Sequence, residues 1–461
     1  MTGLVTPVEP VPLAELGRVH FAGIGGVGMS GIARIMLARG TEVSGSDSGA
    51  SAALDELAAL GALVHVGHAA GQVGDADTVV VSSAIRDSNP ELAEARRRGL
   101  RVLHRAAALA SLMDGRRVTA VTGTHGKTTV TSMITTILLA AGTGPSYAIG
   151  GVLAATGTGA ADGPGGDFVA EADESDGSFL MYAPDVAVVT NIEADHLDNY
   201  GTEPAYRASF EKFIARIEPG GLLVTSADDP GTRHLAQHAR SARVRVVTFG
   251  ESADADYRVT HVTVSGMETS LTIGYPSPRD EQPVSQPTDN SKKRSSAPAR
   301  GAGADDVSGS ATPGAATTAA DTMTRDGQPA GSSHPADPGR QAFMAKGRME
   351  RARPPGSTGI DLRLGVPGHH NALNAAAAFA AAVELGTGPR LAASALAGYR
   401  GTARRLEPKG EAGGVRVLDT YAHHPTELAA DLRAAREILA GAGRVIAVFQ
   451  PHLYSRTRIF A

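Results

Sequence analysis

Two glycine-rich turns place the strongest constraint on what this chain can fold into. The first turn follows the apolar run 18–24 and opens the helical pattern 28–40. The second follows the apolar run 116–124 and opens the helical pattern 126–142. A turn that leads directly from a buried strand into a helix is typical of parallel sheets with crossover helices. Each turn therefore predicts its own α/β unit.

The same alternation of strands and helices runs along most of the sequence. Further strand-like runs occur, in chain order, at 41–47, 63–68, 77–85, 101–105, 167–174, 185–196, 220–229 and 244–250. The segment 256–274 has the pattern of a β-ribbon, 359–366 is a further strand-like run, and 368–386 is an alanine-rich helical pattern. The sequence therefore predicts an α/β protein with an added β-ribbon.

Two segments depart from this pattern. Residues 277–357 are rich in Pro, Gly, Ser, Ala and charge and contain almost no large apolar residues, so we expect a disordered insertion in a β-hairpin. The end of the chain offers one strand–helix–strand unit, with strands at 415–421 and 444–452 around a helix at 425–441. A parallel sheet needs more strands. We therefore expect a C-terminal domain that is truncated or completed by something else.

The composition excludes several classes of function. The formal net charge of −5 over 461 residues gives no basic surface for nucleic acid. The absence of cysteine excludes disulfides, thiolate metal sites and a thioester intermediate. No apolar run reaches the length that crosses a bilayer, and the N-terminus lacks the pattern of a signal peptide. We expect a cytoplasmic protein without membrane insertion.

The second glycine-rich turn has the chemistry of a phosphate-binding loop. Backbone N–H groups of such a loop point at an anion, and the first turn of the helix adds the positive end of its dipole. Lys127 would neutralise phosphate oxygens, and Thr128 would offer a hydroxyl to Mg²⁺. Val121 stands where the usual pattern has its first glycine, but the glycines next to the phosphates remain. A glycine turn that only caps a helix would explain the same residues without a ligand.

The first glycine-rich turn fits the dinucleotide fingerprint. Gly23, Gly25 and Gly28 have the G-x-G-x-x-G spacing, and Asp47 ends the next strand-like run. A NAD-dependent oxidoreductase is one hypothesis for this pattern. The diphosphate of a UDP-sugar would need the same loop, and a tight helix–strand crossing without any ligand is the third interpretation.

Acidic and polar residues follow two strand-like runs of the central unit, in "EADESDGSF" and "TNIEADHLDNY". Because ligands bind beyond the carboxyl ends of the strands in open α/β sheets, we expect these residues near the phosphates. Carboxylates are hard ligands that suit Mg²⁺. His196 follows Asp195 at such a strand end, which favours a metal or phosphate role over a structural one. A solvated loop rim is the alternative for the acidic residues.

Six motifs then identify a family. "HFAGIGGVGMSGIA", "GTHGKTT", "EADESDGSF", "TNIEADHLD", "GHHNALNAAAA" and "YAHHPTE" with "FQPH" occur together and in this order. The set resembles the Mur ligases from about residue 18 to residue 461. The resemblance implies an α/β architecture of three domains: an N-terminal Rossmann-like domain that binds a UDP-sugar (1–114), a central P-loop ATPase domain (115–398) and a truncated C-terminal Rossmann-like domain (399–461).

The resemblance also implies roles for individual residues. The nucleotide phosphates would lie against Gly123, Thr124, His125, Gly126, Lys127, Thr128 and Thr129. The UDP-sugar would lie against Gly23, Gly25, Gly26, Gly28, Ser46, Asp47, Ser82 and Ser83. Mg²⁺ would be held by Thr128, Glu171 and His196. The substrate side of the C-terminal domain would present His423, His424, His452 and Arg456. The remaining nucleotide contacts would come from Asn371 and Asn374 near adenine, Arg405 near the phosphates and Asp419 at the ribose.

The implied reaction is ATP-dependent formation of an amide bond between UDP-N-acetylmuramate and L-alanine, for peptidoglycan precursor synthesis. ATP would convert the carboxylate into an acyl phosphate, and Lys127 and Mg²⁺ would screen the charge as two anions meet. His196 is a weak candidate for the base that takes the proton of the amine, because metal ligation would compete for its lone pair. Two alternatives within the family are a ligase that attaches a preformed peptide during wall recycling and a truncated, non-catalytic homologue that binds the UDP-sugar.

Overall fold

The computed structural model describes residues 3–276 and 357–451 of the chain. The predicted insertion, apart from its last residue, lies outside these ranges, as do the site candidates His452 and Arg456.

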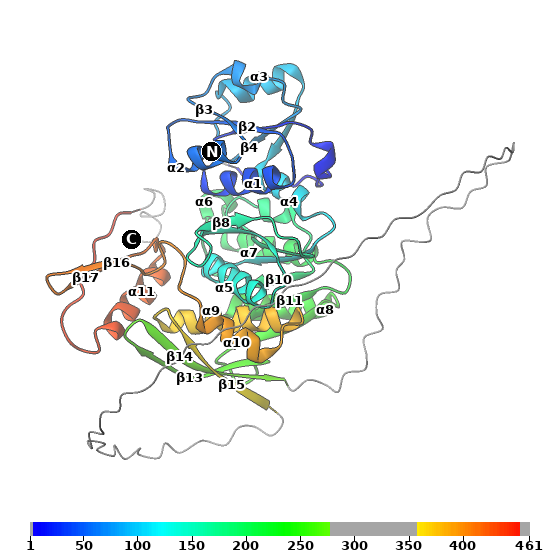
Figure 1. Ribbon diagram of the computed structural model, residues 1–461. Helices are drawn as coiled ribbons and strands as arrows, with labels where there is room; N and C mark the ends of the chain where they lie inside the picture. The colour runs from blue at the N-terminus through cyan, green and yellow to red at the C-terminus, as the bar shows by residue number, and fades with distance from the viewer. Residues whose placement is uncertain (1–2, 277–356, 452–461) are drawn as a thin grey trace, which may run out of the picture. The chain divides into compact units, whose positions relative to one another are not determined.

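The N-terminal region forms a five-stranded parallel sheet in the order β3-β2-β1-β4-β5 (Figure 1). Its strands are β1 Val19–Ala22, β2 Val43–Asp47, β3 Leu63–Val66, β4 Thr78–Val81 and β5 Arg101–His104. Its helices are α1 Val27–Ala38, α2 Ala52–Ala59, α3 Pro90–Arg98 and α4 Arg105–Met113. The strand order reverses between β1 and β4, and in Rossmann folds ligands bind at the carboxyl ends of the strands at such a point. The first glycine-rich turn, between β1 and α1, lies at these strand ends.

The central region forms a ten-stranded mixed sheet in the order β15-β14-β13-β12-β11-β10-β6-β9-β7-β8. Its strands are β6 Arg117–Thr122, β7 Ser146–Leu153, β8 Thr158–Ala161, β9 Asp167–Glu171, β10 Val186–Val189, β11 Leu222–Ser226, β12 Arg245–Gly250, β13 Tyr257–Ser265, β14 Glu268–Pro276 and β15 Ser357–Leu364. Its α-helices are α5 Lys127–Ala140, α6 Leu197–Tyr200, α7 Glu203–Ile214, α8 Pro230–Ser241, α9 His369–Glu384 and α10 Pro389–Ala397. None of the helices within the described ranges is long and apolar enough to cross a membrane.

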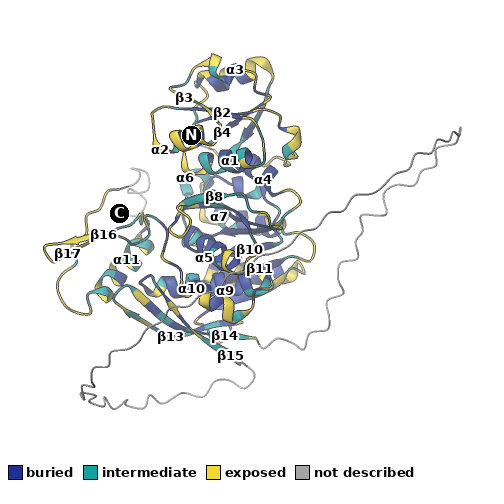
Figure 2. Ribbon diagram, in the orientation of Figure 1, coloured by how far each residue is buried: buried dark blue, intermediate teal, exposed yellow. Residues whose placement is uncertain are grey.

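The parallel strands of this sheet are buried on both faces. In β10, Val186 and Val188 pack in the cluster that contains α5 and α9, whereas Ala187 and Val189 pack in the cluster that contains α7. This follows from the period of two in a strand, which sends successive side chains to opposite faces. Figure 2 shows these strands and α9 mostly in the colour of buried residues. The buried strands therefore hold the loops at their carboxyl ends on a rigid base.

The predicted β-ribbon and the hairpin around the insertion are confirmed. β13 pairs with β14 in antiparallel register, and β14 pairs with β15 so that Pro276 lies opposite Ser357. The residues on either side of the insertion are therefore adjacent.

The predicted strand–helix–strand unit at the end of the chain is only partly found. The helix is present as α11 Pro425–Ile438. The strand β17 Val415–Asp419 pairs with β16 Glu407–Ala412 in an antiparallel hairpin. The prediction of a strand at 444–452 is wrong for residues 444–451, which form no strand. A strand needs a neighbour for its backbone N–H and C=O groups. In the described part of the chain none pairs with this segment, whose Val448 is 97% exposed.

Candidate active site

The loop between β6 and α5 has the geometry of a phosphate-binding loop, and its two glycines are sterically required. Gly123 has a φ of +123°, and a Cβ there would lie 2.2 Å from Thr190 Oγ1. Gly126 has a φ of +83°, and a Cβ there would lie 2.5 Å from Asn374 Oδ1. Residues that carry a side chain rarely adopt these backbone angles, and neither position has room for a Cβ atom. The missing first glycine of the usual pattern has little consequence, because Val121 lies within β6 and is fully buried.

Lys127, the first residue of α5, folds back over this loop. Its Nζ donates to the carbonyl oxygens of Gly123 (2.7 Å) and Thr124 (3.2 Å) and to Glu174 Oε1 (3.0 Å). Glu174 is fully buried. Burial raises the pKa of the Glu174 carboxyl to about 7, against the opposing effect of Lys127. Burial alone would lower the pKa of Lys127, but Glu174 and its acidic neighbours hold it above the ordinary value. The lysine is thus kept as a cation at the mouth of the helix.

A second polar group surrounds the hydroxyl of Thr128. Thr128 Oγ1 donates to Glu171 Oε1 (3.2 Å), and Arg405 Nη2 donates to Thr128 Oγ1 (3.2 Å). The other oxygen of Glu171 accepts the backbone N–H of Gly150 at 2.7 Å. A hydroxyl and a carboxylate side by side at the start of a phosphate loop are the oxygen donors that Mg²⁺ prefers. The structure thus brings together Thr128, Glu171 and Arg405, which lie far apart in the sequence.

His196 lies near Glu174, which also pairs with Lys127. Its Nε2 is 3.7 Å from Glu174 Oε1 and 3.5 Å from Asp195 Oδ2. The residue has a φ of +52° where it caps α6, a backbone conformation that is uncommon for a side chain other than Asn, Asp or His. The structure therefore gives His196 an acidic neighbour, Glu174, that the sequence analysis did not single out.

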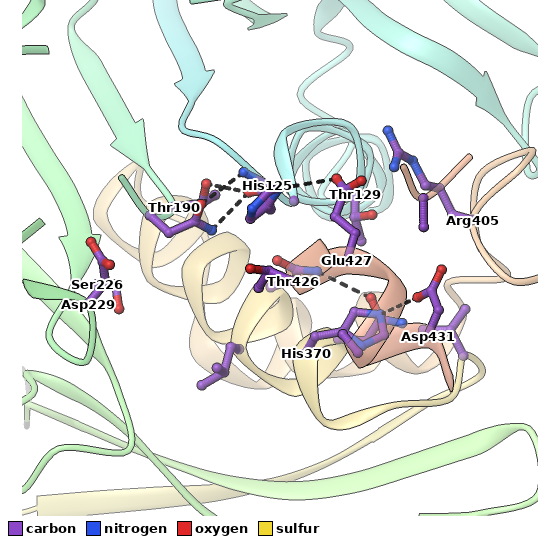
Figure 3. Close-up of a pocket in the computed structure, with 18 of the residues that line it drawn as sticks. His125, Thr129, Thr190, Ser226, Asp229, His370, Arg405, Thr426, Glu427 and Asp431 are labelled. Carbon is purple, nitrogen blue, oxygen red and sulfur yellow. Dashed lines mark hydrogen bonds and ion pairs between the residues drawn. The ribbon is translucent and has the colours of Figure 1, made fainter. Parts of the chain in front are cut away.

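The side chain of His125 connects the phosphate loop to α11, as Figure 3 shows. One ring nitrogen lies 3.3 Å from Glu427 Oε1 and the other 3.4 Å from Glu193 Oε2. Thr426 also donates to Glu193, at 2.7 Å, and the ring of His424 lies 4.4 Å from that of His125.

The electrostatics of this cluster favour a charged histidine. Burial opposes the charge, but the two carboxylates outweigh it and raise the pKa of His125 to about 9. The hydrogen bond from His125 lowers the pKa of Glu193 to about 2. Ligand atoms of His125, Glu193 and His424 lie within 4.8 Å of one another, a spacing that could also hold a metal ion. With a carboxylate at each ring nitrogen, an imidazolium bridge accounts for the arrangement.

A cavity of about 450 Å³ opens beside the phosphate loop and reaches between the central region and the C-terminal segment. The phosphate loop contributes His125, Gly126 and Thr129 to its wall. From α9 and the C-terminal segment come Asn371, Asn374, Arg405, Thr420, Glu427 and Asp431, among others. The cavity has the size of a site for a small organic ligand.

Six of the eleven residues expected to contact the nucleotide line this cavity: His125, Gly126, Thr129, Asn371, Asn374 and Arg405. Asn371 donates to the carbonyl oxygen of Pro367 (2.7 Å) and accepts from Asn374 Nδ2 (3.3 Å), so both amides are oriented by the start of α9. The other five, Gly123, Thr124, Lys127, Thr128 and Asp419, are not among the residues that line it. One carboxylate oxygen of Asp419 lies 3.9 Å from Lys409 Nζ.

The residues expected on the substrate side of the C-terminal segment lie in the turn before α11. His424 caps the helix through a hydrogen bond from the N–H of Thr426 (3.3 Å). Burial lowers the pKa of His424, and the charge of His125 lowers it further. The ring of His423 contacts that of Tyr421. Of these two histidines, His424 faces the phosphate loop, because its ring packs against that of His125.

The first glycine-rich turn is held by Asp47, which ends β2. Asp47 Oδ2 accepts the N–H of Gly25 at 2.9 Å. A Cβ on Gly25 would lie 2.7 Å from Leu54 Cδ1, and one on Gly28 would lie 3.2 Å from Arg105 Nη1. Gly23 has a φ of +82°, and Gly26 caps α1. The turn thus presents backbone at the start of a helix, where an anion binds well.

Polar residues at the carboxyl ends of β2 and β4 line the same edge of the sheet. Ser46 is buried and donates to Glu91 Oε2 at 2.7 Å. Ser82 and Ser83 follow β4, and Ser83 donates to Asp176 Oδ2 at 2.7 Å. Asp176 belongs to the acidic segment after β9, so this hydrogen bond joins the loop after β4 to the central region.

Several residues of the site were missed by the sequence analysis. They are Arg105, Glu174, Glu193, Glu427 and Asp431. Arg105 pairs with Asp173 at 2.8 Å, beneath the first glycine-rich turn. Glu174, Glu193 and Glu427 lie inside the family motifs, each three residues from a chosen residue, and that was the available signal. Asp431 lies one helical turn after a motif and had no signal of its own.

Comparisons with known proteins agree with this geometry. Residues 18–117 match a family described as "Mur ligase family, catalytic domain", residues 121–284 the "Mur ligase middle domain" and residues 404–460 the "Mur ligase, glutamate ligase domain". The UDP-N-acetylmuramate–L-alanine ligase of Thermobifida fusca is 49% identical over 99% of this chain and 81% of the relative. That of Kineococcus radiotolerans is 50% identical over 97% of this chain and 79% of the relative.

Solved structures of Mur ligases have a similar fold. The crystal structure of UDP-N-acetylmuramate-alanine ligase from Thermotoga maritima has a TM-score of 0.66 at 27% identity and covers 92% of this chain and 78% of that one. A murein peptide ligase from Psychrobacter arcticus has the same fold, with a TM-score of 0.64 at 21% identity, over 95% of this chain and 81% of that one. With the three-part architecture, the phosphate loop and the similarity to relatives over nearly the whole chain, this protein belongs to the Mur ligase family.

Proposed function

We propose that this chain is an ATP-dependent ligase that joins the amino group of L-alanine to the carboxylate of UDP-N-acetylmuramate, in peptidoglycan precursor synthesis. One observation carries the proposal: relatives whose names state this activity are 49% and 50% identical over 99% and 97% of the chain. The similarity extends over the first glycine-rich turn, the phosphate loop and the C-terminal segment. Because ATP drives the reaction, we place it in the cytoplasm.

The first step is transfer of the γ-phosphoryl group of ATP to the substrate carboxylate. A carboxylate oxygen forms the new bond to phosphorus, and ADP leaves with the electron pair of the broken bond. Two anions must meet, so the barrier is dominated by charge repulsion. Lys127 at the helix mouth and Arg405 beside Thr128 provide two cations around the loop, and the N–H groups of the loop add further donors.

The site also has residues that fit Mg²⁺. Thr128 and Glu171 offer a hydroxyl and a carboxylate within 3.2 Å of each other, and both are hard oxygen donors. When bound there, Mg²⁺ would neutralise phosphate charge during the transfer. His196 and Glu174 form the neighbouring pair and are the residues we propose for a second ion.

The second step is attack of the neutral amine on the acyl carbon, with phosphate as the leaving group. The attacking nitrogen must lose a proton. His196 has the residue type for this role and lies 3.7 Å from Glu174, but an ion held by this pair would compete for its lone pair. The UDP part of the substrate would lie on the first glycine-rich turn, where Asp47 closes the loop on Gly25.

Phosphate release from ATP tests this proposal directly. The purified chain is assayed with UDP-N-acetylmuramate and L-alanine together and with each omitted. Release that requires both substrates supports the proposal, and the amide product is identified by mass spectrometry. Release with a tripeptide but not with L-alanine would assign the chain to the peptide-attaching branch of the family. Retained binding of UDP-N-acetylmuramate without any turnover would assign a non-catalytic role.

A further inference from the structure

The helix α11 presents two carboxylates to the cavity beside the phosphate loop. Glu427 and Asp431 are four residues apart, so they lie on the same face of the helix, one turn from each other. Both line the cavity, and Figure 3 shows both side chains there. Both carboxylate oxygens of Glu427 have partners, since Oε1 contacts His125 and Oε2 accepts the N–H of His423 (3.2 Å). The two oxygens of Asp431 differ in this respect.

Asp431 is oriented through one of its oxygens while the other stays available. Oδ2 accepts the hydroxyl of Thr420 at 2.5 Å, and Thr420 is fixed in turn because its hydroxyl accepts the N–H of Ala422 (3.2 Å). Oδ1 lies 3.8 Å from His370 Nε2, beyond hydrogen-bond distance. The side chain of Asp431 is 16% exposed and belongs to the cavity wall. A ligand that enters the cavity therefore meets an acceptor whose direction is already set.

The other carboxylates on the cavity wall have structural partners. They are Glu193, Asp228, Asp229 and Glu427. Asp229 caps α8 and accepts the N–H groups of Ile192 and Thr232. Each oxygen of Asp228 accepts a backbone N–H from the turn after β12. Glu193 and Glu427 hold His125. Asp431 differs from these four carboxylates. Among the described residues, no backbone N–H donates to it and no basic side chain forms an ion pair with it within 3.5 Å.

The chemistry of the cavity decides what Asp431 can bind. Phosphate groups belong at the N–H groups of the loop and would be repelled by a carboxylate. A neutral hydroxyl is a donor and gains most from a charged acceptor. Burial raises the pKa of Asp431 to about 6, so the carboxylate is charged at neutral pH. His370 does not neutralise it, because burial lowers the pKa of this histidine to about 4.

Because the cavity lies beside the phosphate loop, the hydroxyl that reaches Asp431 is expected to belong to the bound nucleotide. A nucleotide whose phosphates lie on the loop carries its hydroxyls on the adjoining ribose. An acidic residue on the ribose is a recurring solution in nucleotide sites.

We propose that Asp431 accepts a hydrogen bond from a ribose hydroxyl of the bound nucleotide, with Thr420 as the residue that orients it, and that this contact selects ribonucleotides over deoxyribonucleotides. The inference rests on the proposed function, which makes ATP a substrate. It places the sugar contact on α11, where Asp431 lines the cavity, and not on Asp419, which has a carboxylate oxygen 3.9 Å from Lys409 Nζ.

Binding of ADP and of its 2′-deoxy and 3′-deoxy analogues to the full chain tests the contact without turnover. Isothermal titration calorimetry is carried out on the wild type and on Asp431→Ala, Asp431→Asn and Thr420→Val. A hydrogen bond to a charged group contributes about 1.5–3 kcal/mol, so the wild type is expected to bind ADP about 10-fold to 150-fold more tightly than one deoxy analogue. In Asp431→Ala this ratio is expected to fall below about 3-fold, because ADP loses affinity and the analogue does not.

The controls separate a direct contact from a loss of structure. Glu437→Gln, on an exposed position of α11, removes one charge from the same helix and is expected to leave the ratio unchanged. Asp431→Asn is nearly isosteric and reports on charge with the fold retained. Thr420→Val is expected to reduce the ratio while leaving Asp431 in place. Equal weakening of ADP and both analogues in Asp431→Ala, or no weakening, would overturn the proposal.

Two further outcomes have distinct meanings. If Asp431→Ala abolishes discrimination only against purine riboside diphosphate, which lacks the 6-amino group, the carboxylate faces the base and the proposal is overturned. If the wild type discriminates as expected but releases no phosphate with UDP-N-acetylmuramate and L-alanine, the proposed function fails while the ribose contact stands.

Discussion

The imidazolium bridge between the phosphate loop and α11 yields a prediction with a calculable size. His125 lies between Glu427 and Glu193, and these carboxylates raise its pKa from 6.5 to about 9. At about 1.36 kcal/mol for each pKa unit, the difference amounts to about 3 kcal/mol. A group whose pKa is higher in the folded state stabilises fully below its unfolded pKa and loses this effect as the pH rises through the folded pKa. The stabilisation by His125 is therefore expected to be complete below pH 6.5 and to disappear by about pH 9.

The pKa of His125 can be measured directly by NMR on protein labelled with ¹⁵N-histidine. The chain contains 15 histidines, so the spectrum of His125→Gln is needed to identify the signal. We expect that signal to titrate near pH 9 in the wild type. Glu427→Gln and Glu193→Gln are each expected to lower the pKa, because burial alone disfavours the charged ring. A wild-type His125 that titrates near 6.5 would refute the reasoning, since the ring could not then be held between two carboxylates.

The same substitution should change stability with a particular pH dependence. His125→Gln is expected to destabilise the contact between α11 and the loop by about 3 kcal/mol at pH 6 and by much less at pH 9.5. Hydrogen exchange of the amides of α11 reports on this contact without requiring the whole chain to unfold in one step. His369→Gln is the matched control, because its ion pair with Glu251 is about half exposed and contributes little. A parallel loss of protection at both pH values would contradict the prediction.

Three further predictions concern the loop and its cations. Lys127→Met is expected to lower kcat by at least about 100-fold, because it removes the cation at the mouth of the helix, and phosphate release measures this. Activity within tenfold of the wild type would contradict the proposed function. Arg405→Lys keeps the charge but loses the planar fork that reaches Thr128, so kcat/KM is expected to fall by about tenfold in the same assay. Gly126→Ala would force a Cβ to 2.5 Å from Asn374 Oδ1 and is expected to weaken ADP binding by at least about tenfold in calorimetry, whereas Gly49→Ala, with nothing within 4 Å, should have no effect.

Local sequence was sufficient for the elements that carry the two loops. The apolar run before Gly23 and the one before Gly123 became β1 and β6, and the patterns after them became α1 and α5. These elements are predictable because a buried strand, a glycine turn and an amphipathic helix are each encoded by neighbouring residues. The antiparallel pairing of β14 and β15 was predictable from the strand-like patterns that stand on both sides of the insertion.

The end of the chain shows where local pattern is insufficient. The run 444–452 has the composition of a buried strand, yet residues 444–451 form none and Ile446 is 69% exposed. Strand formation depends on a partner that accepts the backbone hydrogen bonds, and the composition of one segment does not reveal whether a partner is present. The pairing of β17 with β16 illustrates the same limit, because the antiparallel hairpin was not predicted.

By itself, the sequence determined the α/β class, the two anion-binding turns and the family, because these depend on spacings of a few residues repeated along the chain. Tertiary structure alone decided which charged groups meet. It put Glu174 rather than a more distant acid against Lys127, folded Glu427 against His125 and turned Asp431 instead of Asp419 into the cavity. The physical reason is that a side chain's charge state and partners depend on burial and on neighbours brought close from distant segments, and neither is encoded by the residues next to it in the chain.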